Sequence, residues 1–365
     1  MVRIKDITTC LEEMAPLSLQ ESYDNSGLIC GNAEWETGSA LLSLDCTEEI
    51  VEEAIETGCN LIIAHHPVVF SGLKKITGSN YVERTLIKAI QNNIAIYACH
   101  TNLDNVKQGV NQKIAEKLGL RNLRVLLTKS GQLRKLVTFV PGTHLNSLRN
   151  ALFQQGAGHI GNYDSCSFTQ EGTGTFRGNA LSKPFLGKPM ELSQESEVRL
   201  ELIYETSHEN RVLETLKTHH PYEEPAFDCY PISNTHPNIG SGMIGSFESS
   251  LSEHEFLTLL KTQLKAANIR HTPLLNKPIK TVAFCGGSGR FLLNQAIARK
   301  ADAFVTADFK YHDFFDVEGQ LLLADPGHFE TEQFTPEIFY EFIQNKFPKF
   351  AIRLSKINTN PIHYF

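Results

Sequence analysis

The sequence lacks several features that would place the protein in a special class. Its eight cysteines are scattered and form no CxxC pair, so a cysteine-rich zinc site is not expected. Several follow apolar runs, as Cys99 and Cys285 do, which is typical of small buried side chains in a reducing cytoplasm. No stretch approaches the ~20 apolar residues of a membrane span, and the start has no apolar segment of a secretory signal. We therefore expect a cytoplasmic protein that does not enter a membrane.

An excess of basic residues is also absent. The formal charge is −7 at pH 7, with 34 Lys and Arg against 41 Asp and Glu, whereas a general nucleic-acid binder usually has a basic surface. The composition is otherwise that of a globular protein, with 41% hydrophobic and 21% charged residues. A chain of 365 residues suits two or three domains at roughly 100–200 residues each.

Strands and helices alternate in the first third of the chain and again in the last third. The apolar runs that read as strands cover residues 41–44, 61–64 and 94–98, and then 281–285, 303–306 and 321–324. Helical patterns separate them, and this alternation predicts βαβ units with parallel sheets. We expect an α/β core made of two similar halves, residues 1–128 and 237–365.

The middle of the chain, residues 129–236, has a different pattern. Its predicted strands cover residues 136–140, 163–176, 198–204 and 226–232, with helices near 145–155 and 208–218. The order β-α-β-β-α-β is that of a ferredoxin-like α+β domain. We therefore expect an inserted domain in a loop of the core, since loops tolerate insertions well.

Two adjacent histidines, His65 and His66, directly follow the apolar run 61–64, and Pro67 ends the strand. The carboxyl ends of strands in an open α/β sheet are where ligands bind, so this pair is a candidate metal site. An isolated His-His pair is more often a loop pair that hydrogen-bonds locally. The prediction therefore depends on what the other strand ends carry.

Two other strand ends carry histidine and carboxylate four residues apart, His100 with Asp104 and His328 with Glu332, and Asp45 follows a further strand. This spacing puts both side chains on one face of a helical turn. Imidazole with carboxylate is a ligand set for zinc, iron or manganese. The ligands outnumber the three or four of a single zinc. We therefore predict two metal ions that share a bridging carboxylate, an arrangement that polarises a substrate oxygen and activates water.

Weaker signals surround this constellation. Asp24 and Asn25 belong to a stretch of turn-forming residues and either only form the turn or line the rim of the site. Gly287 and Ser288 belong to a glycine run that either makes a tight turn or binds a phosphate through backbone N–H groups. Asp308 follows another predicted strand, where we expect either a structural role or a place at the substrate rim.

Five motifs together resemble those of the Ngg-interacting-factor-three-like family, whose members are often labelled GTP cyclohydrolase I type 2 homologues. They are Asp24–Leu28, Ala64–Pro67, His100–Asp104, Thr306–Asp308 and Asp325–Glu332. Longer members of the family carry a PII- or CutA-like inserted domain, and the middle here, including His220–Pro225, looks like one. Two positions depart from the family: Ala307 stands where glycine is frequent, and Tyr23 stands where tryptophan is common.

The resemblance implies a dinuclear metal centre in which two zinc, iron or manganese ions are bound by His65, His66, Asp104, His328 and Glu332. His100 would be a further ligand or a proton carrier, and the assembly would be a ring-shaped homohexamer. GTP would be a candidate substrate, converted to dihydroneopterin triphosphate and formate. Two alternatives stay open: another metal-dependent phosphoester or nucleotide hydrolase, and a non-enzymatic metal-binding regulator whose insert senses a small molecule.

Overall fold

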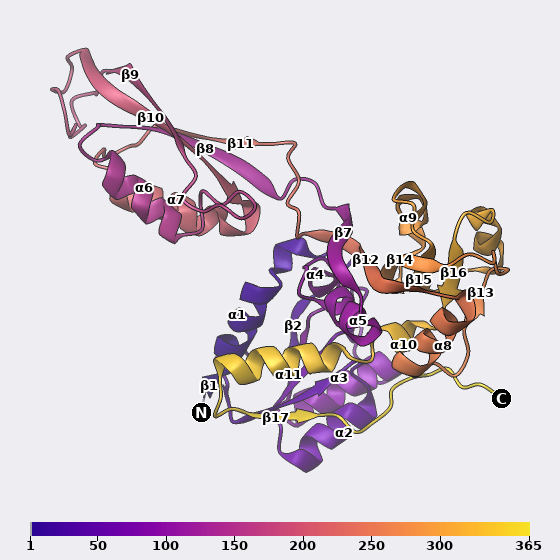
Figure 1. Ribbon diagram of the computed structural model, residues 1–365. Coiled ribbons are helices and arrows are strands. Elements are labelled where there is room, and N and C mark those ends of the chain that lie inside the picture. The colour runs from indigo at the N-terminus through magenta and orange to yellow at the C-terminus, as the bar shows by residue number, and fades with distance from the viewer. Residues whose placement is uncertain (1) are drawn as a thin grey trace. The chain divides into compact units, whose positions relative to one another are not determined.

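The computed structural model describes residues 2–365, which separate into two compact units (Figure 1). Unit 1 contains the residues up to Thr128 together with Asn238–Phe365, and unit 2 contains Lys129–Pro237. Each unit has its own buried apolar core. Within residues 2–365, no helix has both the length and the apolar character needed to cross a membrane.

The first sheet of unit 1 has the strand order β17-β4-β5-β6-β2. Its strands are β17 (Ala351–Leu354), β4 (Ser39–Ser43), β5 (Leu61–Ala64), β6 (Ala95–Ala98) and β2 (Gly27–Cys30). The first four are parallel, and β2 is antiparallel to β6. One face packs against α2 (Glu48–Thr57) and α3 (Tyr81–Gln91). Short strands β1 (Val2–Arg3) and β3 (Glu36–Thr37) form a separate pair.

The second sheet of unit 1 has the order β13-β16-β15-β14-β12-β7. Its strands are β13 (Arg270–His271), β16 (Leu322–Asp325), β15 (Ala303–Ala307), β14 (Ile279–Ser288), β12 (Gly240–Leu251) and β7 (Arg121–Thr128). Only β14, β15 and β16 are parallel to one another. One face packs against α9 (Leu293–Ala298), which contributes Leu293 and Ala296 to a separate apolar cluster.

A single continuous core joins the two sheets of unit 1. It includes buried residues of α1 (Ile4–Met14), α5 (Val110–Leu118), α8 (Glu253–Gln263) and α11 (Thr335–Lys346). Along β5, Ile63 faces this core whereas Ile62 faces the cluster that contains α2 and α3. Strands that are buried on both faces read as continuous apolar runs, which is why the sequence revealed them.

The expectation of βαβ units with parallel sheets in two similar halves is correct only in part. Strands β2, β7, β12 and β13 are antiparallel to their neighbours. The halves also exchange strands: β7, from the first segment, pairs with β12, and β17, near the C-terminus, pairs with β4. Such pairings join residues far apart in the sequence, so local periodicity carries no sign of them.

Unit 2 is a four-stranded antiparallel sheet with the order β11-β8-β10-β9. Its elements are β8 (Leu133–Val140), α6 (Leu145–Gln154), β9 (Phe168–Phe176), β10 (Ser193–Glu205), α7 (Glu209–His219) and β11 (Phe227–Pro231). Both helices pack on one face, where Leu148 and Leu216 meet Leu200 and Leu202 of β10. The β-α-β-β-α-β order is that of a ferredoxin-like domain, although β9 begins at Phe168 and not at Tyr163.

Two remaining short helices, α4 (Thr101–Asp104) and α10 (His328–Glu332), carry candidate ligands. Asn102 of α4 is fully buried. Its side-chain amide donates to the carbonyl of Ala15, at the end of α1, and its carbonyl accepts from the backbone N–H of His100. This side chain therefore ties the loop that carries His100 to α1.

We expect Asn102→Ala to lower the free energy of unfolding of unit 1 by about 1–3 kcal/mol, because it removes the hydrogen bond to the carbonyl of the buried Ala15. Urea unfolding followed through Trp35, the single tryptophan, measures this effect, since Trp35 packs against the core of unit 1. Asn92→Ala is the control: Asn92 is exposed and donates to Lys88 on its own helix. Equal stability of the two variants would contradict the assigned role.

Candidate metal centre

Six candidate ligands predicted from the sequence converge in unit 1. His65 and His66 follow β5, His100 follows β6, and Asp104, His328 and Glu332 lie in α4 and α10. They form three groups in which the potential ligand atoms lie within 4.8 Å of one another: His65, His66 and His100; His66, His328 and Glu332; and His65, Asp104 and Glu332. The clusters of histidine and carboxylate are consistent with metal binding.

Each of the four histidines is held through its Nδ1 atom. The partners are the carbonyl of Cys99 for His65 at 2.8 Å, Asp45 for His66 at 2.7 Å, Asp24 for His100 at 2.7 Å, and Asp308 for His328 at 2.7 Å. A carbonyl or an ionised carboxylate only accepts hydrogen bonds, so each Nδ1–H donates. The Nε2 atom is then left to face the cluster, as in many metal-binding histidines.

Three carboxylates behind the histidines stay ionised. Burial opposes ionisation of Asp24 and Asp45, but hydrogen bonds from His100 and His66, respectively, outweigh it and hold both pKa values below the ordinary value. The hydrogen bond from His328 lowers the pKa of Asp308 in the same way. These carboxylates therefore orient the imidazoles.

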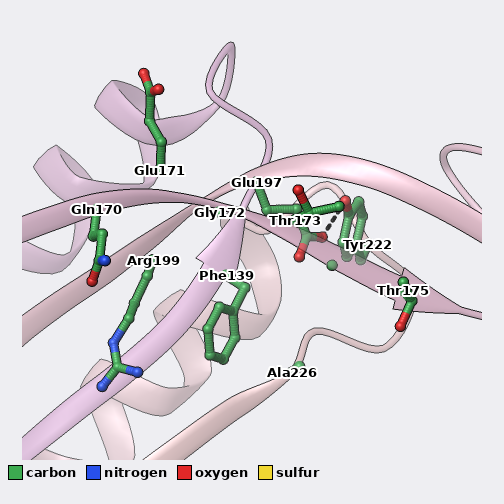
Figure 2. Close-up of a pocket in the computed structure, with 11 residues that line it drawn as sticks. Phe139, Gln170, Glu171, Gly172, Thr173, Thr175, Glu197, Arg199, Tyr222 and Ala226 are labelled. Atoms are coloured by element: carbon green, nitrogen blue, oxygen red, sulfur yellow. Dashed lines mark hydrogen bonds between the residues drawn. The ribbon is translucent and has the colours of Figure 1, made fainter.

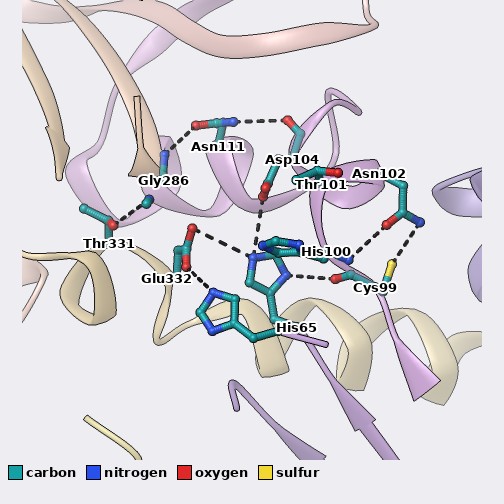
Figure 3. Close-up of polar contacts among 12 residues, drawn as sticks. His65, Cys99, His100, Thr101, Asn102, Asp104, Asn111, Gly286, Thr331 and Glu332 are labelled. Atoms are coloured by element: carbon teal, nitrogen blue, oxygen red, sulfur yellow. Dashed lines mark hydrogen bonds and ion pairs between the residues drawn. The ribbon is translucent and has the colours of Figure 1, made fainter. Parts of the chain in front are cut away.

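Three buried polar groups, those of His65, Asp104 and Glu332, face one another at the centre of the site (Figure 3). Burial lowers the pKa of His65 to about 4, so its Nε2 carries a lone pair at neutral pH. This atom lies 3.7 Å from Asp104 Oδ1 and 3.9 Å from Glu332 Oε1. Within residues 2–365, neither His65 Nε2 nor Asp104 Oδ1 has a hydrogen-bond partner. Buried polar atoms without a partner are unfavourable, and a bound cation would give them one.

Glu332 faces both sides of the cluster. While its Oε1 atom faces His65, its Oε2 atom lies 3.0 Å from His66 Nε2 and 2.9 Å from His328 Nε2. Burial favours its neutral form, but the charge and hydrogen bond of His328 hold its pKa well below the ordinary value. The two oxygens of one carboxylate therefore serve two different groups of ligands.

Charge in the cluster is balanced by imidazolium groups. Burial lowers the pKa of His66 and His328, but the carboxylates around them outweigh this effect and raise the values to about 9 and about 11. Burial and the charge of Glu332 raise the pKa of Asp104 well above the ordinary value. Without a bound metal ion, the protonated histidines thus supply the positive charge of the cluster. A metal dication would supply this charge in their place once they lose their protons.

Two of the weaker sequence candidates lie beside this cluster in different roles. The carboxylate of Asp24 also accepts from the backbone N–H groups of Asn25 and Thr101, so it lies behind His100. Asn25 donates through its side chain to the carbonyl of Val69 at 2.7 Å, which joins two loops. From the sequence, Asp24 was recognised only as part of a turn-forming stretch, because its partner His100 is 76 residues away.

The glycine run has a packing role next to Glu332. The N–H groups of Gly286 and Gly287 donate to Asn111 and Thr331, so they are not free to hold a phosphate. Gly287 has φ +57°, and a Cβ there would lie 2.3 Å from Glu332 Oε1. Glycine is therefore required for Glu332 to reach the centre. Ser288 is exposed and ends β14.

Asp45 and Asp308 each follow a strand that lies next to a strand with a histidine at its end. Asp45 follows β4, the neighbour of β5, and Asp308 follows β15, the neighbour of β16. Each carboxylate holds the histidine of the adjacent strand end. Thr359, which the sequence did not single out, also donates to Asp45 at 2.5 Å. Asp45 and Asp308 could therefore be found from the sequence as carboxylates that follow the strands next to those preceding His66 and His328. No local pattern indicates Thr359.

Comparison with known proteins gives matches over nearly the whole chain. The family model described as Duf34/NIF3 (NGG1p interacting factor 3) matches residues 2–361. A Halalkalibacterium halodurans protein named GTP cyclohydrolase 1 type 2 homolog is 37% identical over 359 residues, covering 97% of this chain and 96% of that protein. A Staphylococcus epidermidis protein with the same name is 35% identical over 371 residues, covering 100% of both.

Solved structures agree with these matches. A Bacillus cereus protein related to NIF3 has a TM-score of 0.86 and 37% identity, with 100% of this chain and 99% of that chain covered. A Staphylococcus aureus protein has a TM-score of 0.79 and 30% identity at the same coverage. The mixed α/β fold described above is therefore the fold of these relatives.

We expect Asp45→Asn and Asp308→Asn each to weaken binding of a divalent ion by about 10–100-fold, because the carboxylates that orient ligating histidines contribute this much. Titration of the metal-free protein with Zn²⁺ against a chromophoric chelator measures the affinity. Asp316→Asn is the control, since Asp316 is exposed and pairs with Arg290. Unchanged affinity in both test variants would show that the carboxylates do not support a metal site.

Proposed function

The chain belongs to the Duf34/NIF3 family, and from this premise we propose that it is a hydrolase dependent on two divalent metal ions. The observation that carries the proposal is the position of Glu332, whose two oxygens face two separate groups of ligands. One ion is held by His65, Asp104 and Glu332, and the other by His66, His328 and Glu332. Zinc, iron and manganese all suit this donor set.

The candidate reaction is conversion of GTP and water to dihydroneopterin triphosphate and formate. The name of the two relatives, GTP cyclohydrolase 1 type 2 homolog, supports this choice. Two bound ions of this kind polarise a substrate oxygen and activate water. His100 carries protons: Asp24 holds its Nδ1–H, so its Nε2 accepts a proton from the attacking water and returns it to a ring nitrogen as the first C8–N bond breaks. A second water then cleaves the remaining C8–N bond and releases formate, and closure of the new ring loses one water, so that one water is consumed overall.

An aromatic surface next to His100 supports a planar substrate. The Phe70 ring lies 6.2 Å from the His100 ring and 6.2 Å from the Tyr23 ring, measured between centroids. Both Phe70 and Tyr23 are at least half exposed. Exposed rings at a site stack on a base without regard to its hydrogen-bonding pattern, so they suit the guanine of GTP.

The family resemblance also leads us to propose a ring-shaped homohexamer in the cytoplasm. All eight cysteines are free thiols, which suits a reducing compartment. A metal-dependent hydrolase of another phosphoester or nucleotide would use the same centre, and a non-enzymatic regulator would bind the metal without turnover.

We expect the wild-type protein to bind about two metal ions per chain, because its ligands form two groups. Asp104→Ala and His328→Ala each remove a ligand from one group and should leave about one ion, whereas Glu332→Ala removes a ligand of both and should leave almost none. Metal analysis after gel filtration measures the ratio. Equal losses in all three variants would contradict a carboxylate shared by two ions.

We expect metal-loaded wild-type protein to release formate from GTP and His328→Ala to lose at least about 100-fold in rate, because it lacks one ligand. His254→Ala is the control, because His254 is exposed on α8, away from the cluster. A coupled formate dehydrogenase assay follows the product. If the wild type holds two metal ions and releases no formate, GTP is excluded, and phosphate release from nucleotides and phosphoesters then separates another hydrolase from a regulator.

A further inference from the structure

Unit 2 contains a cavity that the proposed function leaves unused (Figure 2). It has two lobes of about 400 and 540 Å³, a size that suits a small molecule. Both lobes are lined by Gly174, Thr175, Glu197, Tyr222 and Ala226. The cavity lies on the sheet face opposite α6 and α7, because Glu197 alternates along β10 with the residues that face those helices.

Glu197 and Tyr222 are held in place by a continuous set of hydrogen bonds. The Tyr222 hydroxyl donates to Glu197 Oε1 at 2.7 Å, and the Tyr222 backbone N–H donates to His220 Nδ1 at 3.1 Å. His220 is buried, and its Nε2–H donates to the carbonyl of Phe139 on β8. The His220–Pro225 stretch therefore positions a tyrosine against a carboxylate at the point where the lobes meet.

The Glu197 carboxylate has no cationic partner. The residue is 9% exposed, and none of the Lys, Arg or His side chains within residues 2–365 forms an ion pair with it. Arg199, two positions along β10, pairs with Glu201 at 2.7 Å. Burial and the neighbouring Glu197 raise the pKa of Tyr222, so this phenol stays neutral. A buried carboxylate without a counter-charge is unfavourable, and a cation in the cavity would remove the penalty.

Glycines make room beside this carboxylate. A Cβ on Gly174 would lie 2.1 Å from Glu197 Oε2, so only glycine lets the carboxylate lie against β9. A Cβ on Gly172, directly opposite Glu197 in the sheet, would meet nothing within 4 Å. The Phe139 ring lines the same lobe, and Phe176 lies 6.3 Å from Tyr222 between centroids. The cavity therefore combines the buried Glu197 carboxylate with aromatic walls and open space, while Arg199 lines one lobe and Arg177 the other.

We propose that this cavity binds a small organic cation, a primary ammonium on an apolar or aromatic body. The ammonium donates a charge-assisted hydrogen bond to Glu197 and lies near the Tyr222 ring, and the body packs against Phe139. A metal ion is a poor occupant of the point where the lobes meet, because Glu197 and Tyr222 alone fall short of the three or four protein ligands that it needs. This inference does not depend on the metal centre or on its activity.

Calorimetric titration of the full-length protein with 2-phenylethylammonium tests the proposal, with 2-phenylethanol as the uncharged probe of nearly the same shape. We expect the ammonium to bind and the alcohol to bind at least about tenfold more weakly, a difference of roughly 1.4 kcal/mol. Glu197→Gln should weaken ammonium binding by a similar factor. Glu171→Gln is the matched control, since the Glu171 side chain points away from the Glu197–Tyr222 pair (Figure 2).

A second variant keeps the test valid if Glu197→Gln unfolds. Gly172→Val places a β-branched side chain in the open space opposite Glu197, where a Cβ meets nothing within 4 Å, and should abolish binding. His328→Ala should bind the probe as the wild type does, which separates this cavity from the metal centre. No binding of the ammonium to the wild type, equal binding of the alcohol, or wild-type affinity in Glu197→Gln or Gly172→Val would each overturn the proposal.

Discussion

The arrangement on which the rest of the cluster in unit 1 depends is the meeting of three polar groups at one buried point: the Nε2 atom of His65 and one oxygen each of Asp104 and Glu332. The two oxygens lie 3.7 and 3.9 Å from His65 Nε2, and within residues 2–365 neither this nitrogen nor Asp104 Oδ1 has a hydrogen-bond partner. Such an arrangement persists only if surrounding groups hold each side chain in place and supply positive charge. The carbonyl of Cys99 fixes the first histidine, and the imidazolium of His328 offsets the charge of Glu332.

The fold supplies this arrangement by bringing together the carboxyl ends of parallel strands from two sheets. Each sheet contributes a histidine at one strand end and a carboxylate at the next, and the carboxylate orients the histidine. Because β7 and β17 each join the sheet of the other segment, the two sheets are linked through strand pairing as well as through their common core. The relative position of His65 and Glu332 therefore depends on both segments.

The cavity of unit 2 differs from the cluster of unit 1 in the charges that it contains. The metal centre gathers several charges of both signs, whereas the cavity of unit 2 contains one buried carboxylate next to a neutral phenol and aromatic rings. The first arrangement suits small ions of high charge, and the second suits a single positive charge on a larger apolar body. One chain thus combines a cluster that is consistent with metal binding and a cavity that we propose for an organic cation, each built inside its own unit.

The sequence by itself indicated the parallel strands and the residue types of the cluster. Continuous apolar runs marked the parallel strands because these are buried on both faces, and histidines directly after the runs marked the ends where ligands gather. Antiparallel edge strands such as β13 and β2 were missed, because two to four residues carry too little periodicity. Only the tertiary structure decided that Gly287 makes room for Glu332, that Asp24 lies behind His100, and that Glu197 is buried without a cation. These facts depend on distances between residues far apart in the chain, and local residue patterns contain no information about such distances.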